Sequence, residues 1–161
     1  MTQVTPFLWF GDQAEEAVQR YVSVVPSSRI VSSVRMQSDS PSGPPGSVQV
    51  IEFELGGRPF TAMNAKAMDP FNHAVSLMIG TADQVETDRV WEALLADGGE
   101  AEACGWLKDR YGVSWQVTPI RLSEMLRDPD PARAKRASDA MMTMVKIDIA
   151  ALERAYAGET A

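Results

Sequence analysis

Two stretches of the chain decide the fold: LWFGDQAEEAVQRY at residues 8–21 and LMIGTADQVETDRVW at residues 77–91. In each, a short apolar run ends at a glycine, and a segment with an acidic start and spaced apolar residues follows. Such patterns are typical of a strand followed by an amphipathic helix, and Asp12 with Glu15 is spaced as a capping box. The two stretches therefore predict a repeated strand–helix unit.

Further strands are predicted after each helix. They cover residues 29–36, 48–55, 58–64, 104–108 and 114–119. A tight turn at Gly56 and Gly57 joins two of them as a hairpin. Beyond Pro119 the pattern changes to helix, with Asp130 and Asp148 as helix starts. The predicted fold class is α+β, with two strand–helix–strand–strand–strand modules followed by C-terminal helices.

Length and charge limit the classes of protein to which the chain can belong. The 161 residues fit a single domain, with modules at about 3–65 and 71–120 and helices at about 121–158. The 15 basic and 22 acidic residues give a net charge of −7, which argues against nucleic acid or a membrane surface as partner. No apolar run matches a membrane span, and the N-terminus lacks the basic region of a signal peptide. We therefore expect a cytoplasmic protein.

The sequence lacks the common catalytic and cofactor motifs. Its glycines form neither a Gly-x-Gly-x-x-Gly nor a Walker pattern, so a dinucleotide, ATP or S-adenosylmethionine has no visible cradle. His73 could act as a general base, although a lone histidine at a strand start is more often a surface residue. Cys104 could act as a nucleophile if it is exposed near a cation, although a single cysteine in an apolar strand is usually a core residue.

Several strings, in this order of elements, resemble the vicinal oxygen chelate superfamily of glyoxalases, antibiotic-resistance proteins and extradiol dioxygenases. More narrowly, the chain is similar to the PhnB-like branch, whose members are often labelled 3-demethylubiquinone-9 3-methyltransferase-like. The strings are TPFLWFGDQAEEAVQRYVSVVPSSRI at 5–30, VIEFELGGRPFTAMNA at 50–65, FNHAVSLMI at 71–79, CGWLKDRYGVSWQVTP at 104–119, LSEMLRDPDP at 122–131 and KIDIAALERAYAG at 146–158. The resemblance implies a glyoxalase-like fold, with both modules in one curved mixed sheet, and a homodimer. No glycine-rich motif supports the methyltransferase label.

The resemblance also implies where a metal would bind. Metal-dependent relatives place ligands from several strands on the concave side of the sheet. The matching positions here are Thr5, Asn64, Ala74 or, with a shift, Ser76, and Gln116. None of these residues is a carboxylate or a histidine, the ligands that divalent ions prefer. We therefore expect no metal and no other cofactor, with His73 as the only fallback ligand.

Alternation along the strands predicts which side chains line the concave side and which fill the core. The predicted pocket residues are Thr5, Phe7, Trp9, Phe60, Asn64, Ser76 and Gln116. The predicted core residues are Leu8, Phe10, Val75, Leu77, Ile79, Trp115 and Val117. An aromatic surface with central amides and hydroxyls is typical of a small-molecule pocket. A groove filled by side chains or by a partner subunit is the alternative.

These observations predict a small-molecule-binding protein of the glyoxalase and bleomycin-resistance type, acting as a homodimer without a catalytic metal. Two alternatives stay open. One is a metal-dependent enzyme of glyoxalase, dioxygenase or transferase type, and the other is a structural dimer without a ligand. The sequence does not decide whether the chain is an enzyme.

Overall fold

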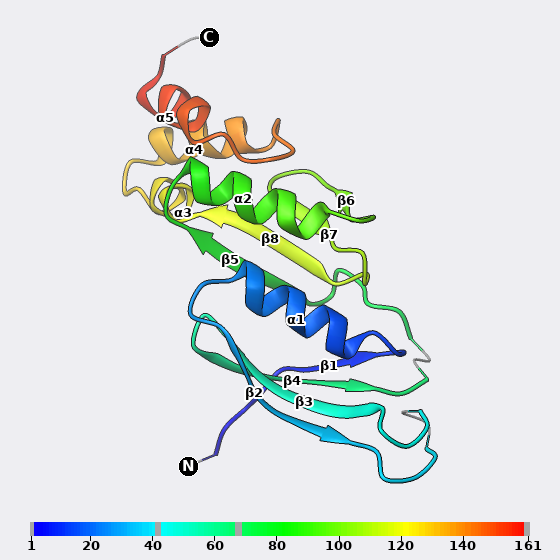
Figure 1. Ribbon diagram of the computed structural model, residues 1–161. Helices are drawn as coiled ribbons and strands as arrows, with labels where there is room; N and C mark the ends of the chain where they lie inside the picture. Colours follow the sequence, from blue (N-terminus) through cyan, green and yellow to red (C-terminus); the bar gives the residue numbers. More distant parts are fainter. Residues whose placement is uncertain (1, 41–42, 67–68, 160–161) are drawn as a thin grey trace. The chain divides into compact units, whose positions relative to one another are not determined.

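The computed structural model describes residues 2–40, 43–66 and 69–159 (Figure 1). The chain divides into two compact units, residues 1–70 and 71–161, and each unit holds one module. Among the described residues, no helix is both long enough and apolar enough to cross a bilayer.

The first module is a four-stranded sheet with one helix on one of its faces. Its elements are β1 (Phe7–Phe10), α1 (Ala14–Val24), β2 (Arg29–Arg35), β3 (Val48–Leu55) and β4 (Arg58–Asn64). The strand order is β1-β4-β3-β2, with β1 parallel to β4 and the other pairs antiparallel. Figure 1 shows α1 lying across one face of this sheet. The core lies under α1, where Tyr21 and Val18 are fully buried with Phe53 and Ile51.

The second module repeats this architecture. Its elements are β5 (Ser76–Thr81), α2 (Gln84–Leu95), β6 (Glu100–Ala101), β7 (Trp106–Lys108) and β8 (Ser114–Pro119). The strand order β5-β8-β7-β6 matches that of the first sheet, and β5 is parallel to β8. Trp115 and Leu107 are buried in its core together with Val90 and Leu94 of α2. The predicted α+β fold with two such modules is confirmed. In place of the one mixed sheet that the resemblance implies, each module forms its own four-stranded mixed sheet.

Three helices follow the second module: α3 (Ile120–Leu126), α4 (Pro131–Met141) and α5 (Ile149–Ala157). Two of them begin where the sequence predicts. The Asp130 carboxylate accepts a hydrogen bond from the Ala132 N–H, and the Asp148 carboxylate accepts one from the Ala151 N–H, each at 2.9 Å. Both are N-cap contacts that satisfy an amide with no partner inside the helix. The helices share a small apolar core made of Leu122, Met125, Ala137, Ile147, Leu152 and Tyr156.

Most of the predicted core residues are buried. Leu8, Phe10, Trp115 and Val117 are at most 7% exposed. The prediction for Val75 is wrong, because this residue is 72% exposed and precedes β5, where strand alternation does not apply. Leu77 and Ile79 are only half-buried. They pair in register with Trp115 and Val117, but β5 is the outer strand of its sheet and leaves one side of them uncovered.

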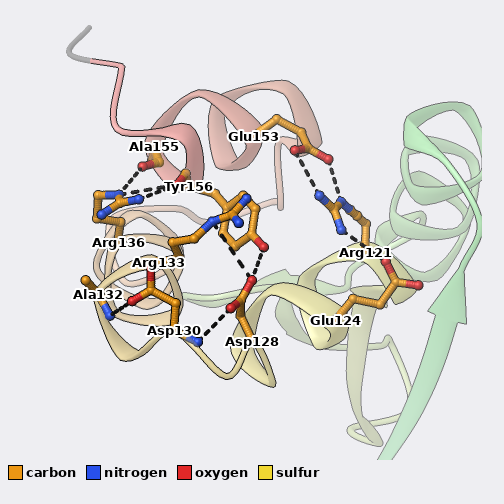
Figure 2. Close-up of polar contacts among 10 residues, drawn as sticks. All are labelled: Arg121, Glu124, Asp128, Asp130, Ala132, Arg133, Arg136, Glu153, Ala155 and Tyr156. Atoms are coloured by element: carbon orange, nitrogen blue, oxygen red, sulfur yellow. Dashed lines mark hydrogen bonds and ion pairs between the residues drawn. The ribbon is translucent and has the colours of Figure 1, made fainter.

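A polar network holds the three C-terminal helices together, and Figure 2 shows its side chains. The Tyr156 hydroxyl donates a hydrogen bond to the Asp128 carboxylate. The guanidinium carbon of Arg133 lies 4.3 Å from the centre of the Tyr156 ring, and that of Arg121 lies 5.4 Å from it. Arg121 also binds Glu153, with 2.5 Å between its Nε and the carboxylate oxygen. The last helix is therefore anchored through charge-assisted contacts.

This network makes the stability of the helices depend on pH. The hydrogen bond from Tyr156, followed by the one from the Asp130 N–H, lowers the pKa of Asp128 from its ordinary value of 3.8. A carboxyl whose pKa is lowered by folding stabilises the protein above its ordinary pKa, and that contribution is lost as the pH falls through the lowered value. We expect Tyr156→Phe to lower the urea midpoint at pH 7, with a difference from wild type that shrinks below about pH 4. Equal losses at pH 7 and pH 3 would contradict this linkage.

Candidate functional site

The face of the first sheet opposite α1 is the candidate site, and we call it the open face of the first module. Strand register defines it by two rows of neighbouring residues. They are Phe7, Thr61, Glu52 and Ser32 in one row, and Trp9, Met63, Val50 and Val34 in the other. The aromatic side chains lie on β1, where Phe7 is 54% and Trp9 47% exposed. The Trp9 indole N–H donates to the Ala65 carbonyl oxygen at 3.2 Å, which fixes the orientation of its ring.

The Glu52 carboxylate lies in the middle of this face. Glu52 is exposed, and its carboxylate accepts a hydrogen bond of 2.8 Å from the Ser32 hydroxyl. No lysine, arginine or histidine pairs with Glu52 within the described ranges of the chain. Glu54, two residues further along β3, differs in this respect because it pairs with Arg29 at 2.9 Å. Glu52 is therefore the carboxylate on this face that a ligand can reach without displacing a protein cation.

Two of the predicted pocket residues in the first module do not lie on this face. β1 and β4 pair in register as Leu8 with Ala62 and Phe10 with Asn64, so the side chains of Phe60 and Asn64 point to the side of α1. The Asn64 amide oxygen accepts a hydrogen bond from the Ala14 N–H at 2.8 Å, and its amide nitrogen donates to the Val48 carbonyl oxygen at 3.3 Å. The prediction that Phe60 and Asn64 share a face with Phe7 and Trp9 is wrong. Thr5 precedes β1 and is exposed.

The second module brings two other predicted pocket residues together. Gln116 on β8 donates a hydrogen bond from its amide nitrogen to the Ser76 hydroxyl on β5, at 2.8 Å. Both residues lie on the face of this sheet opposite α2, where Met78 is 63% exposed. Ser114 belongs to the same face, and its hydroxyl is buried without a hydrogen-bond partner among the residues that the structure describes. This second open face is therefore polar along β8 and apolar at Met78.

Both candidate reactive residues lie outside the strands, His73 before β5 and Cys104 before β7. The His73 Nε2 is 2.8 Å from the Glu102 carboxylate, and the Lys108 Nζ is 3.6 Å from the same carboxylate, so His73 belongs to a polar cluster with these two residues. Cys104 precedes β7 and has a φ of 59°, and its Sγ lies 3.8 Å from the Met142 Sδ. The prediction of a strand over residues 104–108 with a core cysteine is wrong at this end, because the strand begins at Trp106 and Cys104 is partly exposed.

Comparison with known proteins places the chain in a family. A family model described as 3-demethylubiquinone-9 3-methyltransferase matches residues 2–118. The chain belongs to this family. The match includes both modules and ends before α3, so the three C-terminal helices lie outside the part that defines the family.

Solved structures support the same assignment. The PhnB protein from Bacillus cereus is 34% identical, with a TM-score of 0.65 over 73% of this chain and 99% of its own. Protein PA1353 from Pseudomonas aeruginosa is 20% identical, with a TM-score of 0.61 over 74% of this chain and 98% of its own. The fosfomycin resistance protein FosX from Mesorhizobium loti is 16% identical, with a TM-score of 0.54 over 80% of this chain and 100% of its own. The last two share the fold alone.

These comparisons confirm the resemblance to the vicinal oxygen chelate superfamily and its PhnB-like branch. A comparison with curated proteins gave no match.

The positions that the resemblance assigns to metal ligands hold Thr5, Asn64, Ala74 or, with a shift, Ser76, and Gln116. None of these residues is a carboxylate or an imidazole, the groups that divalent ions prefer. Both polar atoms of Asn64 are also engaged by backbone groups. Within the residues that the structure describes, no three His, Cys, Asp or Glu side chains gather at a spacing that could hold a metal.

Proposed function

We propose that the protein binds a small, partly aromatic molecule on the open face of the first module without the help of a metal. The observation that supports this function is the pair of half-exposed aromatic side chains, Phe7 and Trp9, at alternate positions of β1. Aromatic rings that stand together on a sheet face offer stacking area to a flat ligand. Their exposure beside Val34, Val50 and Met63 makes a contiguous apolar surface of the kind that marks interaction sites.

Polar groups on the same face can orient such a ligand. Glu52 and the Thr61 hydroxyl lie next to each other in one row, and the Ser32 hydroxyl binds Glu52. A few polar groups on an apolar surface are typical of small-molecule sites. We further propose that Ser76 and Gln116 make ligand contacts on the open face of the second module, and that the protein acts as a cytoplasmic homodimer.

The proposed function is binding and does not include methyl transfer, although the family description names a methyltransferase. A methyl-transfer reaction needs a site for the methyl donor, and the sequence holds no glycine-rich cradle for one. The metal-dependent enzyme and the structural dimer are the rival functions, and the following experiment separates them from the proposal.

The central test is Trp9→Leu. We expect the full-length protein, treated with EDTA, to bind acridine, a planar ring that is uncharged at pH 8. Trp9→Leu should weaken this binding about tenfold, because stacking on the indole is lost. Val85→Ala is the matched control, since Val85 is 78% exposed on α2 and lies outside the site. Fluorescence titration measures the affinity, and thermal unfolding confirms that both variants are folded.

Each other outcome overturns the proposal. Equal affinity in wild type and Trp9→Leu would place the ligand elsewhere. Binding that appears only after Zn²⁺, Mn²⁺ or Ni²⁺ is added, and that is lost in His73→Ala, would favour the metal-dependent enzyme. An intact dimer that binds no planar molecule would favour the structural function.

A further inference from the structure

We propose that the ligand of the open face of the first module is a planar organic cation, with its ring over Trp9 and Phe7 and its charge beside Glu52. This inference rests on the proposed function and names the chemical class of the ligand.

The charge state of the face supports a cation. Among the eight side chains of its two rows, Glu52 is the only charged one, and the next row on the same side of β3 holds Glu54, which pairs with Arg29. Its carboxylate has one hydrogen bond, from Ser32, and no cation pairs with it among the described residues. Other glutamates of this module are neutralised, because Glu54 pairs with Arg29 and Glu15 pairs with Arg35, both at 2.9 Å. A carboxylate without a protein cation, next to an aromatic surface, favours a ligand that brings the missing positive charge.

The spacing of the strands fits a molecule of two or three fused rings. Glu52 on β3 and Phe7 on β1 lie in the same row with only Thr61 of β4 between them. Because neighbouring strands are about 4.8 Å apart, the two side chains stand about 10 Å apart along this row. A three-ring aromatic cation is long enough to cover the aromatic residues while its charged group reaches Glu52.

Electrostatics on two scales disfavours an anionic ligand. The net charge of −7 lowers the local concentration of anions around the protein and raises that of cations. On the face itself, the faces of the Phe7 and Trp9 rings carry negative electrostatic potential, which attracts cations as well. The Thr61 hydroxyl, next to Glu52 in the row, can accept a hydrogen bond from an ammonium or amino group.

Three ring compounds of the same shape test the charge preference on the full-length protein. They are 9-aminoacridine, a cation, acridine, uncharged at pH 8, and acridine-9-carboxylate, an anion. We expect the cation to bind about fivefold more tightly than the neutral ring, and the anion more weakly still, as an exposed charge pair allows. Glu52→Gln should abolish this difference and leave the affinity for acridine unchanged. Glu54→Gln is the matched control, because it removes the same charge from the same strand at a residue already paired with Arg29.

The outcomes distinguish this inference from the function on which it rests. Equal affinity of wild type for all three rings, or a preference that survives Glu52→Gln, overturns the cation class. If the cation preference fails but Trp9→Leu still weakens the binding of all three ring compounds, the proposed function stands and the ligand class does not. If no ring binds in a manner that depends on Trp9, both the function and the ligand class fail.

Discussion

Asp109→Ala is expected to lower the free energy of unfolding by about 3–5 kcal/mol, since it removes the carboxylate that accepts hydrogen bonds from three N–H groups, two of them buried. The Asp109 carboxylate is 3% exposed and lies in the turn between β7 and β8. One of its oxygens accepts hydrogen bonds from the N–H groups of Tyr111 and Val113, at 2.9 and 3.0 Å. The other accepts one from the indole N–H of Trp115 at 2.8 Å. A single side chain thus orders the turn and holds Trp115, the largest of the fully buried side chains.

Urea unfolding followed by circular dichroism at pH 7 measures this effect. Asp139→Ala is the matched control, because it deletes the same group from the exposed surface of α4, where Asp139 pairs with Lys135. The control should change the free energy of unfolding by less than about 0.5 kcal/mol. Similar values for the two variants would show that the turn reorganises and finds other acceptors for the three donors.

The fold could be predicted because it depends on local patterns. The repeated strand, glycine and helix at residues 8–21 and 77–91 predict both modules, and period-two alternation assigns Leu8 and Phe10 on β1 to the core. The predicted facing of Phe60 and Asn64 on β4 is wrong, because alternation along one strand does not determine which of its two faces is buried. The hairpin predicted at Gly56 and Gly57 does determine it through its register. A two-residue turn pairs Leu55 with Arg58, which places Phe60 opposite Phe53 on the buried side.

The candidate site can be predicted from the sequence only in part, because it too depends on register between strands. The alternating set of Val48, Val50, Glu52 and Glu54 shows that the two glutamates share a face of β3. The sequence does not show which of them has a cation beside it. Arg29 lies far from Glu54 along the chain, and register across the sheet brings the two together while it leaves Glu52 beside Ser32. Ion pairs between strands depend on that register, which no local pattern determines.

The start of α1 shows how such long-range contacts replace local ones. The sequence predicts a capping box at Asp12 and Glu15, but the helix begins at Ala14 with no side-chain cap from its own N-cap residue. Asn64, fifty residues away on β4, accepts the hydrogen bond from the Ala14 N–H instead. A residue that matches a ligand position of the superfamily therefore has a structural contact in this chain.

Asn64→Ala accordingly should destabilise the protein by about 2 kcal/mol, because the Ala14 N–H and the Val48 carbonyl lose their buried partner. The affinity for 9-aminoacridine should stay within about twofold of wild type, since the amide points to α1 and away from Trp9. Asn72→Ala is the control, an exposed asparagine whose side chain accepts a hydrogen bond from the Ala74 N–H. Unchanged stability together with lost affinity would contradict this prediction and indicate that the Asn64 side chain contacts the ligand. Lost stability with retained affinity would instead separate its structural contact from binding on the opposite face of the sheet.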